Sequence, residues 1–266
     1  YGYLGFSQGN FADFETAAEV TARGRELLTR MIDWLKQQGA RILEVDTDGI
    51  YFVPPPSLAG PQAEEALVEA LNQELPEGIR VDLDGRYVAM YCHRMKNYAL
   101  LDAEGTVTLR GSGLRSRSQE PFLREATEEM LTLALQGRAA EIPALFDGLA
   151  ANLRARRLPV KNLARTETLS ESPEGYLKKI EAGSRNRAAA YELALASGRN
   201  LRAGDTVSYY ITGEKATVTA YDNSRLVTDH DPSRPDENPA YYHKKLRELY
   251  RKFAPTLALP DWKPQD

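Results

Sequence analysis

Apolar residues recur at helical spacing in several long stretches of the chain. The clearest stretch is residues 13–38, where residues such as Phe14, Leu28 and Leu35 share one face and Gly39 ends the pattern. The same spacing predicts further helices over residues 61–75, 119–136, 141–156, 173–182, 185–197 and 238–253.

Alternating apolar and polar positions predict strands between these helices. Residues 41–45 and 50–53 flank Asp46-Thr47-Asp48-Gly49, which has Asp and Gly where a hairpin turn requires them. Alternation also predicts strands within residues 79–91, 95–109, 205–211 and 215–219, with turns near Asp84-Gly85 and Glu104-Gly105. The order of elements predicts an α+β fold, in which a sheet bearing the acidic hairpin packs on helices. A mostly helical part with a small β element follows.

Composition narrows the classes of protein that fit. None of the 266 residues lies in a stretch that approaches the roughly 20 apolar residues of a membrane helix. The single cysteine, Cys92, excludes an intrachain disulfide and a cysteine zinc cluster, and favours a reducing compartment such as the cytoplasm. Three histidines argue against a multi-histidine metal site. The start, Tyr1-Gly2-Tyr3, has no initiator methionine and resembles no signal peptide, so we expect a longer parent chain.

Charge is distributed unevenly along the chain, whose net charge is −4. Residues 1–91 carry 7 Lys and Arg against 15 Asp and Glu, whereas residues 92–202 carry 18 against 13. An acidic part followed by a basic part is consistent with metal-binding carboxylates in the first and phosphate contacts in the second. A chance distribution of surface charge is the alternative at this point.

Asp46 and Asp48 are the sharpest candidates for chemistry. Two carboxylates at one hairpin tip repel each other unless a cation lies between them. Magnesium ions accept such oxygen ligands, and two ions about 4 Å apart can hold the attacking and leaving oxygens of a phosphoryl transfer. A solvated turn is the alternative, because Asp and Gly are common turn residues. Asp82-Leu83-Asp84-Gly85 has the same spacing, and we expect it to be a plain hairpin turn.

Several motifs in order resemble those of family B DNA polymerases. Leu43-Glu44-Val45-Asp46-Thr47-Asp48-Gly49-Ile50-Tyr51-Phe52 resembles the family's third polymerase motif, and Tyr1-Gly2-Tyr3 resembles the end of the second. Met95-Lys96-Asn97-Tyr98-Ala99 is similar to the Lys-Lys-x-Tyr element, and residues 110–118 lie where the family has a Lys-Gly and a run of arginines. Residues 169–211 resemble its thumb. The resemblance covers nearly the whole chain.

The resemblance implies a right-hand polymerase fold of which this chain is one part. Residues 1–136 would be the C-terminal part of the palm, and residues 137–266 the thumb. The exonuclease domain, the first acidic motif and nearly all of the fingers would lie upstream. We therefore expect a fragment, or one half of a split enzyme, that is inactive by itself.

The resemblance also implies site residues in the palm. Asp48 matches the family's catalytic aspartate and metal ligand, and Asp46 its less critical neighbour. Tyr1 matches the tyrosine that lies against the nascent base pair. Lys96 and Tyr98 match the residues that grip primer–template DNA, although Met95 replaces the first lysine of that element.

Further DNA-binding residues follow from the basic stretches. Arg110, Arg115 and Arg117 lie in a glycine-containing loop, which lets backbone N–H groups and arginine forks approach phosphate. This loop ends in Ser118 where the family has Asp, so its ion pairing must differ. On the thumb, the resemblance adds Lys178, Lys179, Arg185 and Arg187 as backbone contacts. For each of these residues taken singly, a solvated surface position is the alternative.

The function implied is DNA-directed DNA polymerase, acting with Mg²⁺ or Mn²⁺ in the complete enzyme. The expected partners are primer–template DNA, deoxynucleoside triphosphates and the missing N-terminal palm and fingers, without a membrane. The expected location is the cytoplasm, at the nucleoid in a prokaryote. Two alternatives stay open: a non-catalytic duplex-DNA-binding module, and an unrelated metal-dependent transferase with an Asp-x-Asp site.

Overall fold

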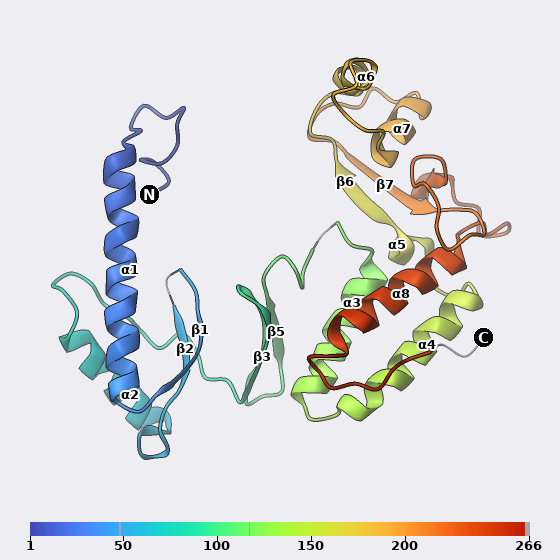
Figure 1. Cartoon of the computed structure of the whole chain (residues 1–266). Helices are drawn as coiled ribbons and strands as arrows, with labels where there is room; N and C mark the ends of the chain where they lie inside the picture. The colour runs from blue at the N-terminus through green and yellow to red at the C-terminus, as the bar shows by residue number, and fades with distance from the viewer. Residues whose placement is uncertain (48, 117, 264–266) are drawn as a thin grey trace. The chain divides into compact units, whose positions relative to one another are not determined.

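The computed structural model describes residues 1–47, 49–116 and 118–263. The chain divides into two compact units, Tyr1–Arg86 and Tyr87–Asp266, which are described separately (Figure 1). Within the described residues, no helix is long and apolar enough to cross a membrane. The mixture of helices and small antiparallel sheets confirms the predicted α+β class.

The first unit places a hairpin beside a long helix. Helix α1 (Phe14–Gln37) begins at Asp13, whose carboxylate accepts the N–H of Thr16 at 3.0 Å, and this bond lowers the pKa of Asp13. Gly39, with φ of +86°, turns the chain into β1 (Arg41–Val45), which pairs antiparallel with β2 (Ile50–Val53). The short helix η1 (Pro56–Leu58) and helix α2 (Pro61–Gln73) complete the unit. The predicted helices and hairpin are confirmed.

The core of the first unit is small. Its fully buried members are Leu35, Ala40 and Leu67, which come from α1, the following turn and α2. Ile42, Ile50 and Phe52 of the hairpin are partly buried against them. These three side chains anchor the hairpin, so that its tip is held by apolar burial on one face of the strands.

The second unit begins with a three-stranded sheet. Strands β3 (Ala89–Arg94), β4 (Asn97–Leu101) and β5 (Val107–Arg110) pair antiparallel in that order. Helix α3 (Pro121–Leu135) packs on β3 and β4. The short helix η2 (Ala139–Glu141), helix α4 (Ile142–Arg154) and the last helix α8 (Pro239–Phe253) follow in this layer, and α8 lies against α3 and α4 (Figure 1).

The remainder of the second unit is a smaller sheet with its own helices. Strands β6 (Arg165–Thr168), β7 (Thr206–Ile211) and β8 (Ser224–Leu226) pair antiparallel. The helices of this part are α5 (Val160–Leu163), α6 (Pro173–Glu181), α7 (Ala189–Ala196) and the short η3 (Val227–Asp229). One large core serves the whole unit, and its fully buried aromatic side chains include Phe122, Phe146, Tyr176, Tyr242 and Phe253.

Two predicted strands differ from the structure: the stretch 79–91 is confirmed only from Ala89, where β3 begins, and the strand predicted at 215–219 is wrong. Residues 79–88, all of them described, form neither a strand nor the hairpin expected at Asp82-Leu83-Asp84-Gly85. Instead the side chain of Asn72 on α2 bonds both backbone groups of Val81, at 2.8 and 2.9 Å. Residues 215–219, also described throughout, form no strand, and the carbonyl of Lys215 accepts the Asn238 side chain. The chain pairs β7 with β6 and β8 instead, neither of which was predicted.

The remaining differences concern boundaries. Helix α7 begins at Ala189, four residues after the predicted start, and the alternating stretch 95–109 is confirmed as β4 and β5 with Gly105 in their turn at φ of +85°. The compact units divide after Arg86. The division of the chain at residues 136 and 137 into palm and thumb stays a prediction, and α3 before that point packs on α4 and α8 after it.

Asn238 joins three parts of the second unit. The residue is fully buried, and its N–H donates to the carbonyl of Ile211 at 2.9 Å. Its Oδ1 accepts the N–H of Tyr241 at 3.0 Å and so caps α8. Its Nδ2 donates to the carbonyls of Thr212 and Lys215 at 3.2 and 3.0 Å. A single side chain therefore caps a helix and donates to two backbone carbonyls.

We predict that Asn238→Ala lowers the free energy of unfolding of the second unit by about 2 kcal/mol, since it removes a helix cap and two hydrogen bonds to backbone carbonyls. The measurement is urea unfolding followed by tryptophan fluorescence in a Trp34→Phe background. There Trp262, which is buried and donates to Asp147 at 2.8 Å, reports on the second unit alone. The control is Asn200→Ala at an exposed position. Equal midpoints for the two variants would contradict the assignment.

Candidate active site and nucleic-acid interface

The tip of the β1–β2 hairpin holds the acidic motif. The N–H of Asp46 donates to the carbonyl of Gly49 at 2.9 Å and closes the tip. The N–H of Thr47 donates to Oδ1 of Asp46 at 2.7 Å, which restrains the orientation of this carboxylate. Asp48, the predicted catalytic residue, lies outside the described residues. The described part of the tip thus presents one oriented carboxylate.

The donor chemistry of this tip suits a hard divalent cation. Carboxylate oxygens are the ligands that Mg²⁺ and Mn²⁺ prefer, and Asp46 offers them with a fixed orientation. Among the described residues, however, no group of three or more His, Cys, Asp or Glu side chains lies close enough to hold a metal ion. The described residues of the tip therefore supply at most part of the ligand set of such a cation.

The N-terminal segment exposes aromatic side chains, which sequence reasoning missed. Tyr1, the predicted nascent-base-pair residue, is 70% exposed, and its carbonyl accepts the N–H of Gly5 at 2.8 Å. The segment is tied to the start of α1 by the N–H of Asp13, which donates to the carbonyl of Leu4 at 2.9 Å. Five aromatic residues are exposed here: Tyr1, Tyr3, Phe6, Phe11 and Phe14. Exposed apolar surface of this kind is typical of an interface.

The turn between β3 and β4 carries Lys96. Arg94 and Asn97 face each other across the strands, so Met95 and Lys96 form the loop, and Lys96 adopts a left-handed φ of +60°. Gly111, at φ of +92°, lies directly against this turn: a Cβ there would be 2.0 Å from the Lys96 carbonyl oxygen. The turn and the loop after β5 therefore touch through backbone atoms.

Asn97 joins the same two segments through its side chain. Its Nδ2 donates to the carbonyl of Met95 at 3.0 Å, and its Oδ1 accepts the N–H of Gly113 at 2.6 Å. The loop is held further by Leu114, which is buried, and by Lys252, whose Nζ donates to the Gly113 carbonyl at 3.2 Å. Sequence reasoning assigned no role to Asn97, although its place between Lys96 and Tyr98 was a signal.

The cations of this surface differ in their surroundings. Arg110 and Arg115 are exposed, and neither has an ion-pair partner within the described ranges. Arg117 lies outside those ranges. Tyr98 is only 4% exposed, so its ring packs inside the protein, and its predicted contact with DNA stays a prediction. The exposed arginines are the side chains best placed for a phosphate.

The far end of the arginine loop is tied to β6. Arg165 donates from Nε to the carbonyl of Ser118 at 3.1 Å and lies 4.0 Å from the carboxylate of Glu120, which is itself buried. Burial opposes its ionisation, but the nearby Tyr209 and Glu120 outweigh burial and raise the pKa of Arg165. The ion pairing at the end of this loop therefore uses Glu120.

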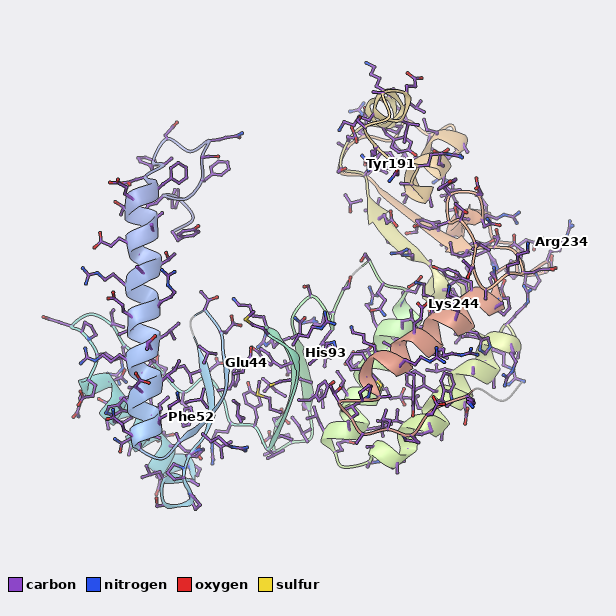
Figure 2. All side chains as sticks on the ribbon, viewed as in Figure 1. Glu44, Phe52, His93, Tyr191, Arg234 and Lys244 are labelled. Atoms are coloured by element: carbon purple, nitrogen blue, oxygen red, sulfur yellow. The ribbon has the colours of Figure 1, made fainter. Side chains whose placement is uncertain are left out.

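Three of the four cations predicted for the thumb are already paired. Lys179 lies 2.8 Å from Glu171, which also pairs with Arg185. The guanidinium of Arg185 lies over the rings of Tyr191 and Tyr176, 4.5 and 5.3 Å from their centroids (Figure 2 labels Tyr191).

Arg187 is engaged more extensively. Its guanidinium lies 2.9 Å from Glu192 and 3.6 Å from Asp222, and it covers the ring of Tyr221. The hydrogen bond to Glu192 raises the pKa of Arg187. Lys178 is exposed and has no ion pair within the described ranges. Of the four, Lys178 is the one whose charge the fold does not use.

His93 lies where the β3–β4–β5 sheet meets α8. Its ring packs on Phe253 with centroids 4.7 Å apart (Figure 2). Both ring nitrogens are buried and have no hydrogen-bond partner among the described residues. Burial, followed by the charges of Lys252 and Arg94, lowers the pKa of His93. The fold therefore favours the neutral imidazole at this contact.

Known proteins are similar in sequence to this chain over most of its length. No family model matches the chain. The DNA polymerase of Thermococcus sp. (strain 9oN-7) is 27% identical over 246 residues, which are 91% of this chain and 31% of that protein. The DNA polymerase of Methanocaldococcus jannaschii is 24% identical over 249 residues, again 91% of this chain, but 14% of that protein.

A solved structure extends the likeness to the fold. The family B DNA polymerase of the hyperthermophilic archaeon Pyrobaculum calidifontis matches 98% of this chain and 32% of its own length, with a TM-score of 0.68 and 21% identity. The resemblance to family B DNA polymerases is confirmed. The chain spans less than a third of the length of these family B relatives.

We predict that the second unit loses stability as pH falls from 7 to 5. The pKa of His93 is depressed in the folded state, so below about pH 6.5 the unfolded chain binds more protons, and the full stability is present only above that pH. His243, whose pKa is lowered by burial and by Arg154 and Arg247, acts in the same direction.

The test is the free energy of unfolding against pH in the Trp34→Phe background. His93→Phe keeps the ring contact and removes the titration. It should flatten the profile by at most about 1.4 kcal/mol per pH unit, and by less because the ring is partly solvated. Above about pH 7.5 the difference in stability between the two proteins should be constant, because neither His93 state titrates there. Parallel profiles would contradict the role given to His93.

Proposed function

We propose that this chain is the C-terminal palm and thumb part of a DNA-directed DNA polymerase, with the palm in residues 1–136 and the thumb in residues 137–266. The observation that carries the proposal is the match of over nine-tenths of the chain to one continuous part of archaeal DNA polymerases. The acidic tip of the β1–β2 hairpin supports it, because residues 43–52 resemble the family's third motif.

In this proposal the hairpin contributes to nucleotidyl transfer from a deoxynucleoside triphosphate to a primer 3′ end. Asp48 and Asp46 would hold Mg²⁺ or Mn²⁺, which supplies charge stabilisation at the reacting phosphate. The chain's own part is to orient the carboxylates: Thr47 restrains Asp46, and burial of Ile50 and Phe52 fixes the strands below. Further ligands and the fingers would come from the N-terminal part of the polymerase.

The second part of the proposal is a grip on the primer–template duplex. Lys96, Arg110, Arg115 and Arg117 would contact phosphates beside the β3–β4–β5 sheet, and Lys178 would do so on the thumb. Such contacts position the duplex and carry no sequence information. Lys179, Arg185 and Arg187 would contribute less, because their charges are paired within the protein. Tyr1, exposed at the start of the chain, would lie against the nascent base pair.

A non-catalytic duplex-binding module is the second candidate. The unrelated Asp-x-Asp transferase accounts less well for a likeness that extends far beyond the hairpin. Both candidates differ from the polymerase in what loss of Asp48 does.

We predict that, in an active polymerase containing this chain, Asp48→Ala abolishes primer extension. The reason is the loss of a metal ligand, which costs about 4 kcal/mol of transition-state stabilisation. Asp46→Ala should reduce the rate less. The control is Asp84→Ala, which removes an exposed carboxylate at the same spacing in the 82–85 segment. The assignment would be contradicted if Asp46→Ala lowered the single-turnover rate more than Asp48→Ala does, or if Asp48→Ala stayed active.

We also predict which cations set the salt dependence of duplex binding. Neutralising Z phosphates gives a log–log slope of about −0.9Z, so Lys96→Ala, Arg115→Ala and Arg117→Ala should each flatten the slope by about one. Arg187→Ala should leave the slope near that of the wild type, because Glu192 and Asp222 already hold its charge.

The measurement is the duplex dissociation constant of the 266-residue chain over a series of salt concentrations. Arg138→Ala is the matched control, since that arginine is exposed and paired with Glu141 at 2.7 Å. A slope that changes in Arg187→Ala and not in Arg115→Ala would indicate that the duplex contacts the thumb instead.

A further inference from the structure

We infer that Asn97 is a positioning residue of the DNA grip. Its side chain hydrogen-bonds the Met95–Lys96 turn to the Gly111–Leu114 loop. This link holds Lys96, in the turn, and Arg115, just after the loop, in a fixed arrangement for contact with the duplex. The inference rests on the proposed function for its ligand, the phosphate backbone of duplex DNA. In this arrangement an uncharged residue positions the charged side chains of the surface.

The first step is the pair of hydrogen bonds made by Asn97. The Nδ2 group donates to the Met95 carbonyl at 3.0 Å, within the turn, and Oδ1 accepts the Gly113 N–H at 2.6 Å, across to the loop. An amide is the side-chain group of this length that both donates and accepts. One residue therefore bonds both segments at once.

The second step is the lack of space between the segments. A Cβ at position 111 would lie 2.0 Å from the Lys96 carbonyl oxygen, and one at position 113 would lie 2.7 Å from Oδ1 of Asn97. Side-chain carbons do not approach other atoms so closely, so glycine at both positions is what permits the contact. Lys96, with its left-handed φ of +60°, is held in a costly conformation that the neighbouring contacts must offset.

The hydrogen-bonded link made by Asn97 lowers the cost of ordering these two segments when the duplex binds. Turns and loops that carry charged side chains are mobile unless they are restrained, and ordering them on binding costs affinity. Lys252 holds the Gly113 carbonyl and Arg165 holds the Ser118 carbonyl, so the loop is restrained on its other sides. Asn97 links it to the Lys96 turn. Without that link the two cation-bearing segments would have to be ordered separately by the duplex.

The test is a double-mutant cycle between Asn97 and Gly113. Asn97→Ala removes the hydrogen-bonded link directly. Gly113→Ala displaces it from the other side, because the new Cβ clashes with Oδ1 of Asn97, and the backbone at Gly113 is not left-handed. Each single variant of the 266-residue chain should weaken binding to a fluorescein-labelled duplex by about fivefold. In the Asn97→Ala background, Gly113→Ala should weaken it no further, since the atom that it clashes with is gone.

Ser112→Ala, at an exposed position in the same loop, is the control and should bind like the wild type. The thermal midpoint of each variant, measured alongside, should stay within a few degrees of the wild type, which shows that the fold is intact. Affinities that are unchanged by Asn97→Ala, or losses that multiply in the double variant, would overturn the inference while leaving the duplex grip standing. A wild-type chain that does not bind the duplex would overturn the proposed grip, and the inference with it.

Discussion

The contact between the backbone of Gly111 and the carbonyl of Lys96 is the constraint on which the proposed DNA-binding surface depends. It brings a two-residue turn and a loop together at a distance that no side chain at position 111 allows. The amide of Asn97 then closes the junction from both sides. From this junction the chain continues into Leu114, which is buried, and Arg115, which is exposed. In the proposed surface, this junction of backbone and amide groups thus positions the charged side chains of Lys96 and Arg115.

Charge in the second unit serves two separate purposes. Arg185 and Arg187 have carboxylate and aromatic partners, and their main effect is to join α6, α7 and the loop at Tyr221. Arg110, at the end of β5, and Arg115, in the loop that follows, have no ion pairs among the described residues. The excess of lysine and arginine over residues 92–202 therefore overstates the charge available to phosphate. What matters for binding is which cations the fold leaves uncompensated.

Much of the fold was predictable, because amphipathic helices such as α1 and α8 repeat their apolar residues locally. The hairpin was predictable because its turn residues lie between two apolar strands. The stretch predicted at 79–91 is a strand only from Ala89, and the strand predicted at 215–219 was wrong. Asn72 and Asn238 bond backbone groups of Val81 and Lys215 in these segments, and periodicity contains no information about such bonds. The motif around Asp46 and Asp48 was readable as a family resemblance. The Asn97–Gly113 contact was not, since it depends on how a loop folds back sixteen residues later.

The central claim is that the β3–β4 turn faces duplex DNA, and photo-cross-linking tests it most directly. Met95 is 78% exposed at the tip of that turn, so a photoreactive amino acid at position 95 would report on contact without replacing a cation. The matched control is the same amino acid at Val88, which is 66% exposed in the same unit and outside the turn. The account predicts a DNA adduct from position 95, lost at high salt, and little from position 88. An adduct from position 88 and none from position 95 would contradict it.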